Sequence, residues 1–312
     1  MSKFALSIGL PKSRFDGSFQ FDVAFQKKYA DSLIPQLQQM GSVLQPYVEV
    51  DMDVAAEYKF YTFRAPRTAN KVTERFGDTP VNHQQYSRRR LQLSMFDDGD
   101  LIDDFDKLKA ATDPAGAIQE EMRYAFGRAK DSCIITAADA TVYAGKEGTE
   151  QVTLPAKQVM SSSLGSTGAT GLNTTKIRRA NRLFGAASIP ATEARYCALT
   201  AAQIEDLLAS TEVTSSDYNS VKALVNGEVN SFCGFTFVQT ELLETNSSNE
   251  RKVIFFTKKS FTLAIGKDIA AEIYKRGDKK MNTQVYTKMF IGCVRMDENR
   301  VVIAPCKETA LA

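Results

Sequence analysis

The stretch DPAGAIQEEMRYAFGRAKDSCIITAA at residues 113–138 decides the fold of this chain. Asp113 followed by Pro114 predicts a helix start, because Asp caps free backbone N–H groups and proline fits the first helical position. Apolar residues then recur at spacings of three and four, namely Ile118, Met122, Ala125, Phe126, Ala129 and Cys133. The polar residues expected on the other side are Gln119, Glu120, Arg123, Arg128 and Lys130. The pattern predicts one amphipathic helix over 114–138, about 37 Å long at 1.5 Å per residue, with a scaffolding role.

Two blocks of opposite charge precede this helix. Residues 64–90 contain seven basic and two acidic side chains, whereas residues 97–113 contain seven Asp and two Lys. The whole chain has 39 Lys and Arg against 37 Asp and Glu, so its net charge of +2 hides two opposed blocks. Either both blocks are ordinary solvated faces, or the basic block of one copy meets the acidic block of another and sets the register between copies. The contact residues expected in the second case are Arg75, Arg88, Arg89, Arg90, Asp97, Asp98, Asp100 and Asp103.

The basic block lies between two segments with strand character. Residues 57–64 (EYKFYTFR) are rich in aromatic side chains, and residues 89–96 (RRLQLSMF) alternate apolar and polar side chains at period two. The polar residues between them show no core pattern. We therefore predict a hairpin that projects from the body of the protein. Upstream, residues 22–46 are expected to be helical, with interruptions at a proline and a glycine.

Beyond residue 193 the pattern predicts mixed helices and strands. Strands are expected at 194–199, through 235–238, and at 252–257 and 260–265. Thr200 and Gln203 have the spacing of a capping box, which predicts a short helix after residue 200. Turn residues at 277–278 and 297–299 bracket a strand through 285–294, and residues 301–304 are expected to pair with it. These two strands would form a long antiparallel ribbon at the C-terminal end.

Composition excludes several classes of protein. The length of 312 residues and the 43% of apolar residues are typical of a soluble chain of about two domains. The sequence pI of about 8.1 argues against a strongly basic nucleic-acid-binding domain. No apolar run reaches the ~18 residues of a membrane span. Five scattered Cys predict buried thiols in a reducing compartment, without a disulfide or zinc framework.

The search for a catalytic or ligand site also finds no candidate with the right pattern. His83 is the single histidine, lies in the polar stretch, and has no nucleophile motif beside it. The Ser- and Gly-rich segment 161–171 lacks the Gly-Lys-Ser/Thr ending of a phosphate loop, so a mobile polar loop is expected there. The Asp cluster at 97–106 does not have EF-hand spacing and is expected to be surface charge. We therefore expect no enzyme activity, no cofactor and no bound metal.

A series of short motifs resembles the major capsid proteins of tailed bacteriophages. They occur in one order along residues 25–306, and they are the segments 75–80, 87–90, 101–103, 106–107, 113–114, 127–131, 144–148, 216–219, 223–227, 234–235, 266–268 and 291–292. The resemblance implies an α+β fold of the Hong Kong 97 type. In that fold, residues 1–50 would be an N-terminal arm and 51–112 an extended loop with its flanking strands. A peripheral domain would comprise 113–164 and 273–312 around the long spine helix, and a mixed axial domain would comprise 165–272.

The same resemblance implies a self-assembling shell protein without enzyme activity. It would form the pentamers and hexamers of an icosahedral head that encloses double-stranded DNA, and it would be made in the host cytoplasm. The expected partners are other copies of the chain, a portal, separate scaffolding or decoration proteins, and packaged DNA through non-specific contacts, with no membrane. Two alternatives stay open: an encapsulin-like compartment that holds cargo protein, and a nucleotide-dependent enzyme that uses the 161–176 loop.

Overall fold

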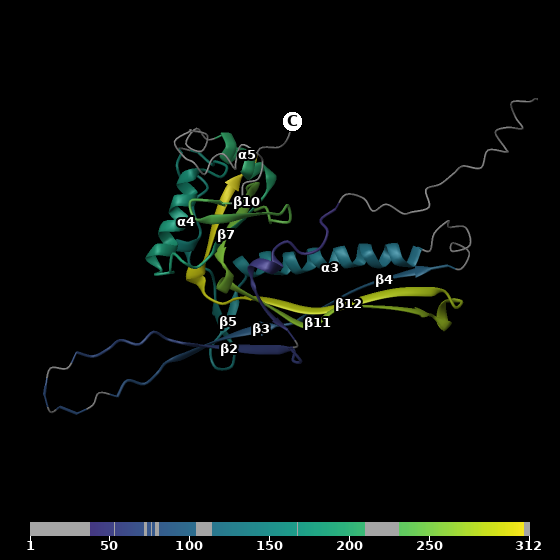
Figure 1. Cartoon of the computed structure of the whole chain (residues 1–312), viewed down its shortest axis with the longest axis horizontal. Coiled ribbons are helices and arrows are strands. Elements are labelled where there is room, and N and C mark those ends of the chain that lie inside the picture. Colours follow the sequence, from purple (N-terminus) through teal and green to yellow (C-terminus); the bar gives the residue numbers. More distant parts are fainter. Residues whose placement is uncertain are drawn as a thin grey trace, which may run out of the picture.

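An elongated body carries a lobe on one side and a hairpin that projects beyond it (Figure 1). The structure is a computed structural model, and the residues that it describes are 38–52, 54–71, 74–75, 77–78, 81–103, 114–166, 168–209 and 231–308. Helices and strands are mixed along the chain, as expected. Asp113 and most of the segment 22–46 lie outside the described residues. Within the described part of that segment, 38–44 contains no helix, and only a short 3-10 helix follows, η1 (Gln45–Tyr47).

The long helix α3 (Pro114–Asp139) forms the body together with a four-stranded sheet. This helix confirms the prediction for 114–138. The sheet order is β1 (Glu49–Met52), β11 (Phe261–Lys275), β12 (Thr283–Arg295) and β4 (Ser94–Ile102). From Thr283 to Ile291 every second side chain of β12 is buried, and Val285, Met289 and Ile291 share a core with Met122 and Phe126 of α3. The alternation along β12 therefore holds the sheet against the helix.

The ribbon beside α3 is built from different strands than the sequence predicts. β12 pairs antiparallel with β11 through the turn at η4 (Gly277–Lys279), and its other edge is occupied by β4. No edge of β12 is left for the residues expected to pair with it. After the short helix η5 (Glu298–Arg300), β13 (Val301–Lys307) instead pairs with β10 (Glu250–Thr257) in the lobe. The prediction that 301–304 completes the ribbon is therefore wrong.

The lobe is a five-stranded sheet covered by two helices. Its strand order is β13, β10, β7 (Arg195–Leu199), β9 (Phe235–Gln239) and β8 (Ser231–Phe232). On one face, α4 (Thr174–Ala186) and α5 (Ala201–Ala209) pack into a core that includes Phe184, Leu207 and Phe255. The opposite face contributes Ile254 and Phe256 to the core of the body. The short helix predicted after residue 200 is confirmed, and one half of the predicted capping box is present, because the Thr200 backbone N–H donates to Gln203 Oε1 at 2.8 Å.

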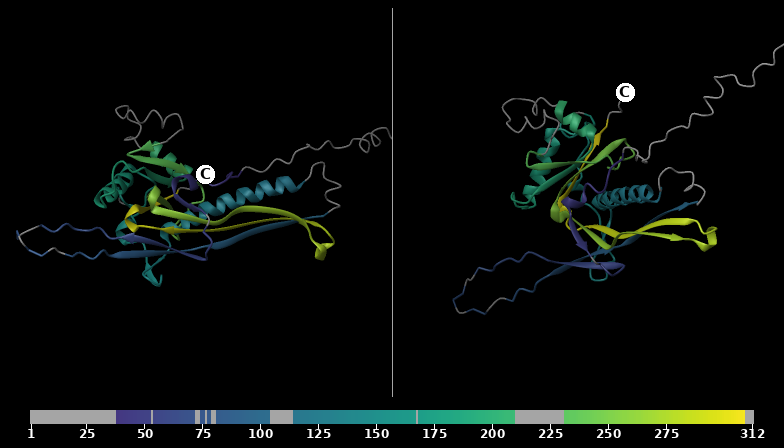
Figure 2. Two further views of the ribbon diagram at one scale, coloured as in Figure 1. Left: turned by 60° about the horizontal axis from the view of Figure 1, so that its bottom comes forward. Right: turned by 45° about the vertical axis from the view of Figure 1, so that its right-hand side comes forward.

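The projecting hairpin is the edge of a third sheet (Figures 1 and 2). β2 (Tyr58–Arg64) pairs antiparallel with β3 (Tyr86–Gln92), which confirms the predicted hairpin. The sheet continues through β5 (Val142–Ala144) and β6 (Glu150–Val152). Short 3-10 helices at Ala156–Gln158 (η2) and Lys258–Ser260 (η3) complete the described elements.

The predicted strand at 89–96 is in fact two strands in two sheets. β3 ends at Gln92 and β4 begins at Ser94, while the Leu93 backbone N–H donates to the Glu57 carbonyl at 3.0 Å. Leu91 and Leu93 are buried as expected, but Met95 is 60% exposed. The change of sheet turns Met95 away from the core, so the simple alternation fails at that point.

Candidate assembly surfaces

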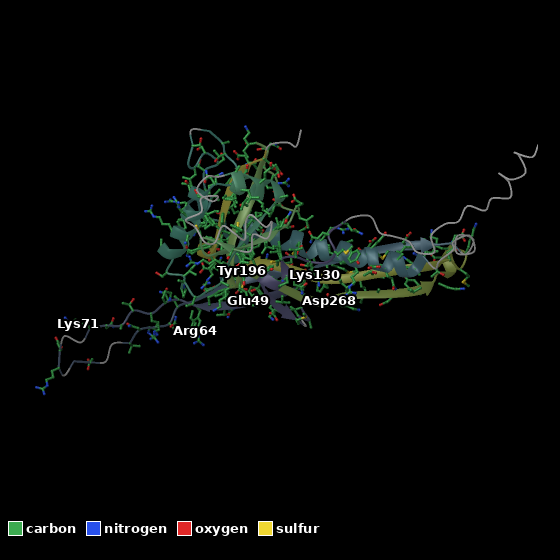
Figure 3. The ribbon with its side chains drawn as sticks, turned by 45° about the horizontal axis from the view of Figure 1, so that its top comes forward. Glu49, Arg64, Lys71, Lys130, Tyr196 and Asp268 are labelled. Atoms are coloured by element: carbon green, nitrogen blue, oxygen red, sulfur yellow. The ribbon has the colours of Figure 1, made fainter. Side chains whose placement is uncertain are left out.

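The described residues of the two charge blocks lie toward opposite ends of the molecule. The basic hairpin projects from one end, whereas β4 runs along α3 toward the other (Figures 1 and 2). Twelve residues of extended chain separate Arg88 from Asp100, which corresponds to about 40 Å at about 3.3 Å per residue. In Figure 3, Arg64 and Lys71 lie along the projecting hairpin, away from Lys130 and Asp268 beside α3. The described carboxylates on and beside β4 are therefore too far from the projecting hairpin to neutralise it within one molecule.

The expected contact residues of the basic block differ in how far they are exposed to solvent. Arg75 and Arg88 are exposed. Arg89 donates to Glu298 Oε2 at 2.7 Å, and the Arg90 guanidinium lies over the rings of Tyr58 and Tyr143, at 5.1 and 4.6 Å from their centroids. Arg89 and Arg90 therefore brace the base of the hairpin, where cation–π contacts and a largely buried ion pair add rigidity. Of the three consecutive arginines, Arg88 is the one that faces solvent.

The expected contact residues of the acidic block are all exposed. Asp97, Asp98 and Asp100 lie on β4, and Asp103 follows directly after it. Because β4 is at the edge of its sheet, these carboxylates line a strand edge that has no partner within the described residues. Charges on an edge strand oppose pairing with an identical edge. This edge therefore disfavours a second copy of itself and favours a basic partner.

Large apolar side chains accompany both charge blocks. The exposed apolar residues on the hairpin and on the sheet of β1, β11, β12 and β4 include Tyr58, Phe60, Tyr86, Met95, Leu101, Ile273 and Tyr274. Phe60 and Tyr86 are 42% and 63% exposed. Grouped apolar surface rimmed by charge is typical of a protein-binding site. The hairpin and the ribbon of β11, β12 and β4 therefore have the character of protein-binding surfaces.

An anchor for the N-terminal segment, not identified from the sequence, joins residues 38–44 to α3. The buried Asp131 carboxylate accepts hydrogen bonds from the backbone N–H groups of Val43 and Leu44, at 2.9 and 3.1 Å, and from the side chains of Gln39 and Ser42. One turn earlier, a Cβ on Gly127 would lie 2.5 Å from the Gly41 backbone. Asp131 lies outside the apolar stripe from which the helix was predicted, so the sequence pattern did not mark it as buried.

Lys130 was expected on the polar side of the helix, but it is only 5% exposed. Its Nζ donates to Asp268 Oδ1 at 2.9 Å, which ties α3 to β11 (Figure 3). Burial acts to raise the pKa of Asp268, but the hydrogen bonds from Lys130 and the Ile269 N–H outweigh it and leave the pKa below its usual value. The reason for the burial is tertiary, because β11 supplies the counter-charge over this part of the helix.

The loop at 161–171 is not arranged as a phosphate site. Lys176, in the first turn of α4, is fully buried, and its Nζ donates to the carbonyl oxygens of Thr170, Gly171 and Pro305 at 2.8, 3.0 and 2.9 Å. A lysine held this way joins the loop to β13 and cannot reach a ligand in solvent. His83 is exposed on the hairpin. Among the described residues, no three His, Cys, Asp or Glu side chains gather as a metal site requires.

The cysteines follow their prediction only in part. All five are free thiols; Cys197 and Cys306 are buried, and Cys133 and Cys293 are partly buried. Burial raises the pKa of the Cys133 thiol to about 11. Cys233, in contrast, is exposed at the turn between β8 and β9, so the prediction of a buried side chain is wrong there. None of the helices in the described ranges is long and apolar enough to cross a membrane.

Comparisons with known proteins agree with this architecture. A family model described as phage capsid protein matches residues 22–308. The capsid of cyanophage P-SCSP1u is similar in structure with a TM-score of 0.69 and 15% identity, covering 99% of this chain and 100% of that one. The capsid of Helicobacter pylori bacteriophage KHP30 gives a TM-score of 0.71 and 9% identity, with 95% and 99% covered. A search of curated proteins finds no match.

A third solved structure, the capsid of Ralstonia phage GP4, gives a TM-score of 0.69 and 10% identity over 100% of both chains. At such low identity the likeness in structure establishes the shared fold. The family match covers nearly the whole sequence, including the spine helix, the hairpin and both charge blocks. The chain therefore belongs to the phage capsid protein family and is a major capsid protein of the head shell.

Proposed function

We propose that this capsid protein assembles as pentamers and hexamers into an icosahedral virion head around double-stranded DNA, and that it has no enzymatic role. The single observation that supports this most is the separation of the charge blocks. A basic projection at one end and an acidic strand edge at the other cannot pair within one chain, but they can pair between copies. Complementary patches of this kind set register and suppress wrong contacts.

We further propose that the chain follows the Hong Kong 97 layout. The N-terminal arm would comprise residues 1–50, and the hairpin of β2 and β3 would be the extended loop. Helix α3 with the ribbon of β11 and β12 would be the core of the peripheral domain. The five-stranded lobe sheet with α4 and α5 would be the axial domain. Because β11 continues past residue 272 as part of the body sheet, the axial domain would not include β11. Because β13 pairs within the lobe sheet, the axial domain would also include residues 301–307.

We propose that the hairpin of one copy lies along the acidic edge of β4 on a neighbouring copy. Arg89 and Arg90 already contact Glu298 and Tyr143 of their own chain. The proposed contact with the neighbouring copy would therefore use the exposed Arg88 and the basic residues nearer the tip of the hairpin, with Arg75 among them. The opposing carboxylates would be Asp97, Asp98, Asp100 and Asp103. The exposed aromatic residues of the hairpin would then be buried by the neighbour.

Charge reversal tests this contact. Arg88→Glu is expected to prevent normal shells in negative-stain electron microscopy, and a second reversal, Asp98→Lys, is expected to restore part of the yield. Lys157→Glu in η2, away from the hairpin, is the matched control and should leave shells unchanged. Wild-type shells from Arg88→Glu alone would refute the contact. A wild-type chain that stays monomeric at all concentrations would refute the proposed assembly itself.

A further inference from the structure

Two carboxylates outside the hairpin hold its two strands. Asp51 of β1 accepts hydrogen bonds from Tyr61, at 2.5 Å, and from Lys59, which both belong to β2. Glu298 of η5 accepts a hydrogen bond from Arg89 of β3 at 2.7 Å. We call Asp51 and Glu298 the hairpin clamp. Each strand of the hairpin is therefore tied to a different element of the molecule.

Both ties of the hairpin clamp act at the same level of the hairpin. Tyr61 and Arg89 are directly opposite each other in β2 and β3, so their side chains share one face of the hairpin. The pairing of β3 with β5 ends at the same residue, where Arg89 lies opposite Ala144. Further out, Arg67 donates to the Asn82 carbonyl, which belongs to the hairpin itself. Beyond the level of Tyr61 and Arg89, the hairpin projects from the sheet (Figures 1 and 2).

The Glu298 half of the clamp is largely buried and lies near the end of α3. The side chains of Arg89 and Glu298 are each 14% exposed, and Glu298 Oε1 lies 4.0 Å from Arg295 Nε. Arg295 is fully buried, and it donates to the carbonyl oxygens of Ala138 and Ala140 at 2.7 and 3.1 Å. Burial lowers the pKa of Arg295, Glu298 opposes this effect, and Arg89 adds to it. Without the charge of Glu298, the two guanidinium groups would repel each other and drive Arg89 outward together with β3.

The Asp51 half of the clamp holds β2 through an ammonium group and a hydroxyl group. The hydrogen bonds from Lys59 and Tyr61 lower the pKa of Asp51, so the carboxylate is ionised near neutral pH. Burial and the hydrogen bond to Asp51 raise the pKa of Tyr61, so its hydroxyl stays protonated and donates. The apolar core beneath the hairpin is small, and its buried members are Val54, Leu91, Leu93, Val142, Ala264 and Val294. The direction of the hairpin therefore depends on the clamp as well as on apolar packing.

We propose that the hairpin clamp sets the direction in which the hairpin leaves the body, and that this direction selects the curvature of the shell. This inference rests on the proposed assembly, in which the hairpin of one copy lies along β4 of the next. Val81 lies eight residues before Arg89, about 26 Å along an extended strand, so a turn of about 10° at the clamp moves Val81 by about 5 Å. Such a displacement changes the angle at which two neighbours meet, and in a closed shell that angle fixes the diameter. Asp51 and Glu298 are positioning residues, because they act on the neighbour through the hairpin.

Double electron–electron resonance measures the direction of the hairpin in the unassembled chain. Val81→Cys provides one spin-label site on the hairpin, where Val81 is exposed, and the native exposed Cys233 of the lobe provides the second. The chain with the native Glu298 and Asp51 should give one narrow distribution of label distances. Asp51→Asn and Glu298→Gln should each shift or broaden this distribution by about 5 Å, the displacement expected for a turn of about 10°. The double variant should change it further.

Glu193→Gln is the matched control. Glu193 forms an ion pair with Arg300 of η5, and its side chain is 16% exposed, close to the 14% of Glu298. Because Glu193 directly precedes β7, this pair ties η5 to the lobe and not to the hairpin. Its loss should leave the label distances as they are in the native chain. Arg89→Lys keeps a cation beside Glu298 and should also leave them unchanged, whereas Arg89→Gln should act like Glu298→Gln.

Negative-stain electron microscopy then compares the shells that the same variants form. The wild type, Glu193→Gln and Arg89→Lys should each give shells of one diameter. Asp51→Asn, Glu298→Gln and Arg89→Gln should give mixed diameters or open sheets from the same amount of folded protein. A role in stability alone would lower the yield of shells without changing their diameter.

The outcomes separate this inference from the function on which it rests. If the clamp variants keep the native distribution of label distances, the clamp does not set the hairpin direction and the inference is wrong. If the distances change but the shells keep one native diameter, the direction does not select curvature and the inference is again overturned. If Glu298→Gln does not fold, Arg89→Gln removes the same contact from the hairpin side and takes its place in both measurements. A wild-type chain that forms no shell refutes the proposed assembly, while the label distances still test the clamp.

Discussion

Replacing Gly127 by Ala should destabilise this protein, although the same change normally stabilises a helix. Alanine gains about 1 kcal/mol over glycine in a helix interior. At Gly127, however, the new Cβ would lie 2.5 Å from the Cα and carbonyl carbon of Gly41 and 2.9 Å from the Ser42 nitrogen. These are backbone atoms, so no side-chain rotation relieves the overlap. The segment 38–44 must move away from α3 or the helix must bend.

The magnitude follows from opposing terms. Overpacking a filled interior costs about 1–3 kcal/mol. Displacement of the segment would also strain its hydrogen bonds to Asp131, each worth about 1 kcal/mol net. Subtracting the gain in helix propensity leaves an expected loss of about 1–3 kcal/mol in the free energy of unfolding. Gly116→Ala in the same helix is the matched control, because a Cβ there has no atom within 4 Å.

Urea denaturation of the two variants, followed by circular dichroism, measures the difference. Gly116→Ala should stabilise the protein by up to about 1 kcal/mol, so the two substitutions should differ in sign. Hydrogen exchange should also show faster exchange at residues 43–44 in Gly127→Ala and not in the control. A stabilising Gly127→Ala, or unchanged exchange at residues 43–44, would show that the anchor is not packed as described.

Three further predictions concern charged side chains that bond to distant segments of the chain. Asp131→Ala should lower the free energy of unfolding by about 2–5 kcal/mol in urea, because two backbone N–H groups lose their acceptor; Glu121→Ala, on the exposed side of α3, should change it by less than about 0.5 kcal/mol. Lys176→Met should cost about 2–4 kcal/mol in thermal unfolding, because three buried carbonyls lose their donor, and a stability equal to wild type would refute the carbonyl cage. Asp268→Asn should cost about 1 kcal/mol near neutral pH, discounted because Asp268 is 57% exposed. The folded-state pKa of Asp268 lies below the unfolded value of about 3.9. The loss of stability caused by Asp268→Asn is therefore present above about pH 3.9 and should vanish as the pH falls through the folded-state pKa. A loss that stays unchanged down to about pH 2 would exclude the ion pair with Lys130.

For the charged contact residues, the sequence predicted some features correctly, whereas others depend on contacts with distant parts of the chain. The exposure of Arg88 and of the Asp residues on β4 agrees with their expected availability to a partner. The engagement of Arg89 with Glu298 could not be predicted, because those two residues are more than two hundred positions apart. Arg90 is likewise fixed by Tyr143, from a strand that the sequence did not indicate. Whether the remaining charges meet a neighbouring copy stays a prediction.

The sequence by itself determined the elements whose signals are local. The helix at 114–138 follows from a proline start and apolar spacing, the hairpin from two aromatic or alternating strands around a polar stretch, and the two charge blocks from residue types alone. Tertiary structure decided which strand pairs with which, because a strand pattern specifies a buried face but not the neighbour at its edge. It placed β13 in the lobe once β4 and β11 had taken both edges of β12. It also buried Lys130 and Asp131, since polar side chains enter a core only where distant segments supply their partners.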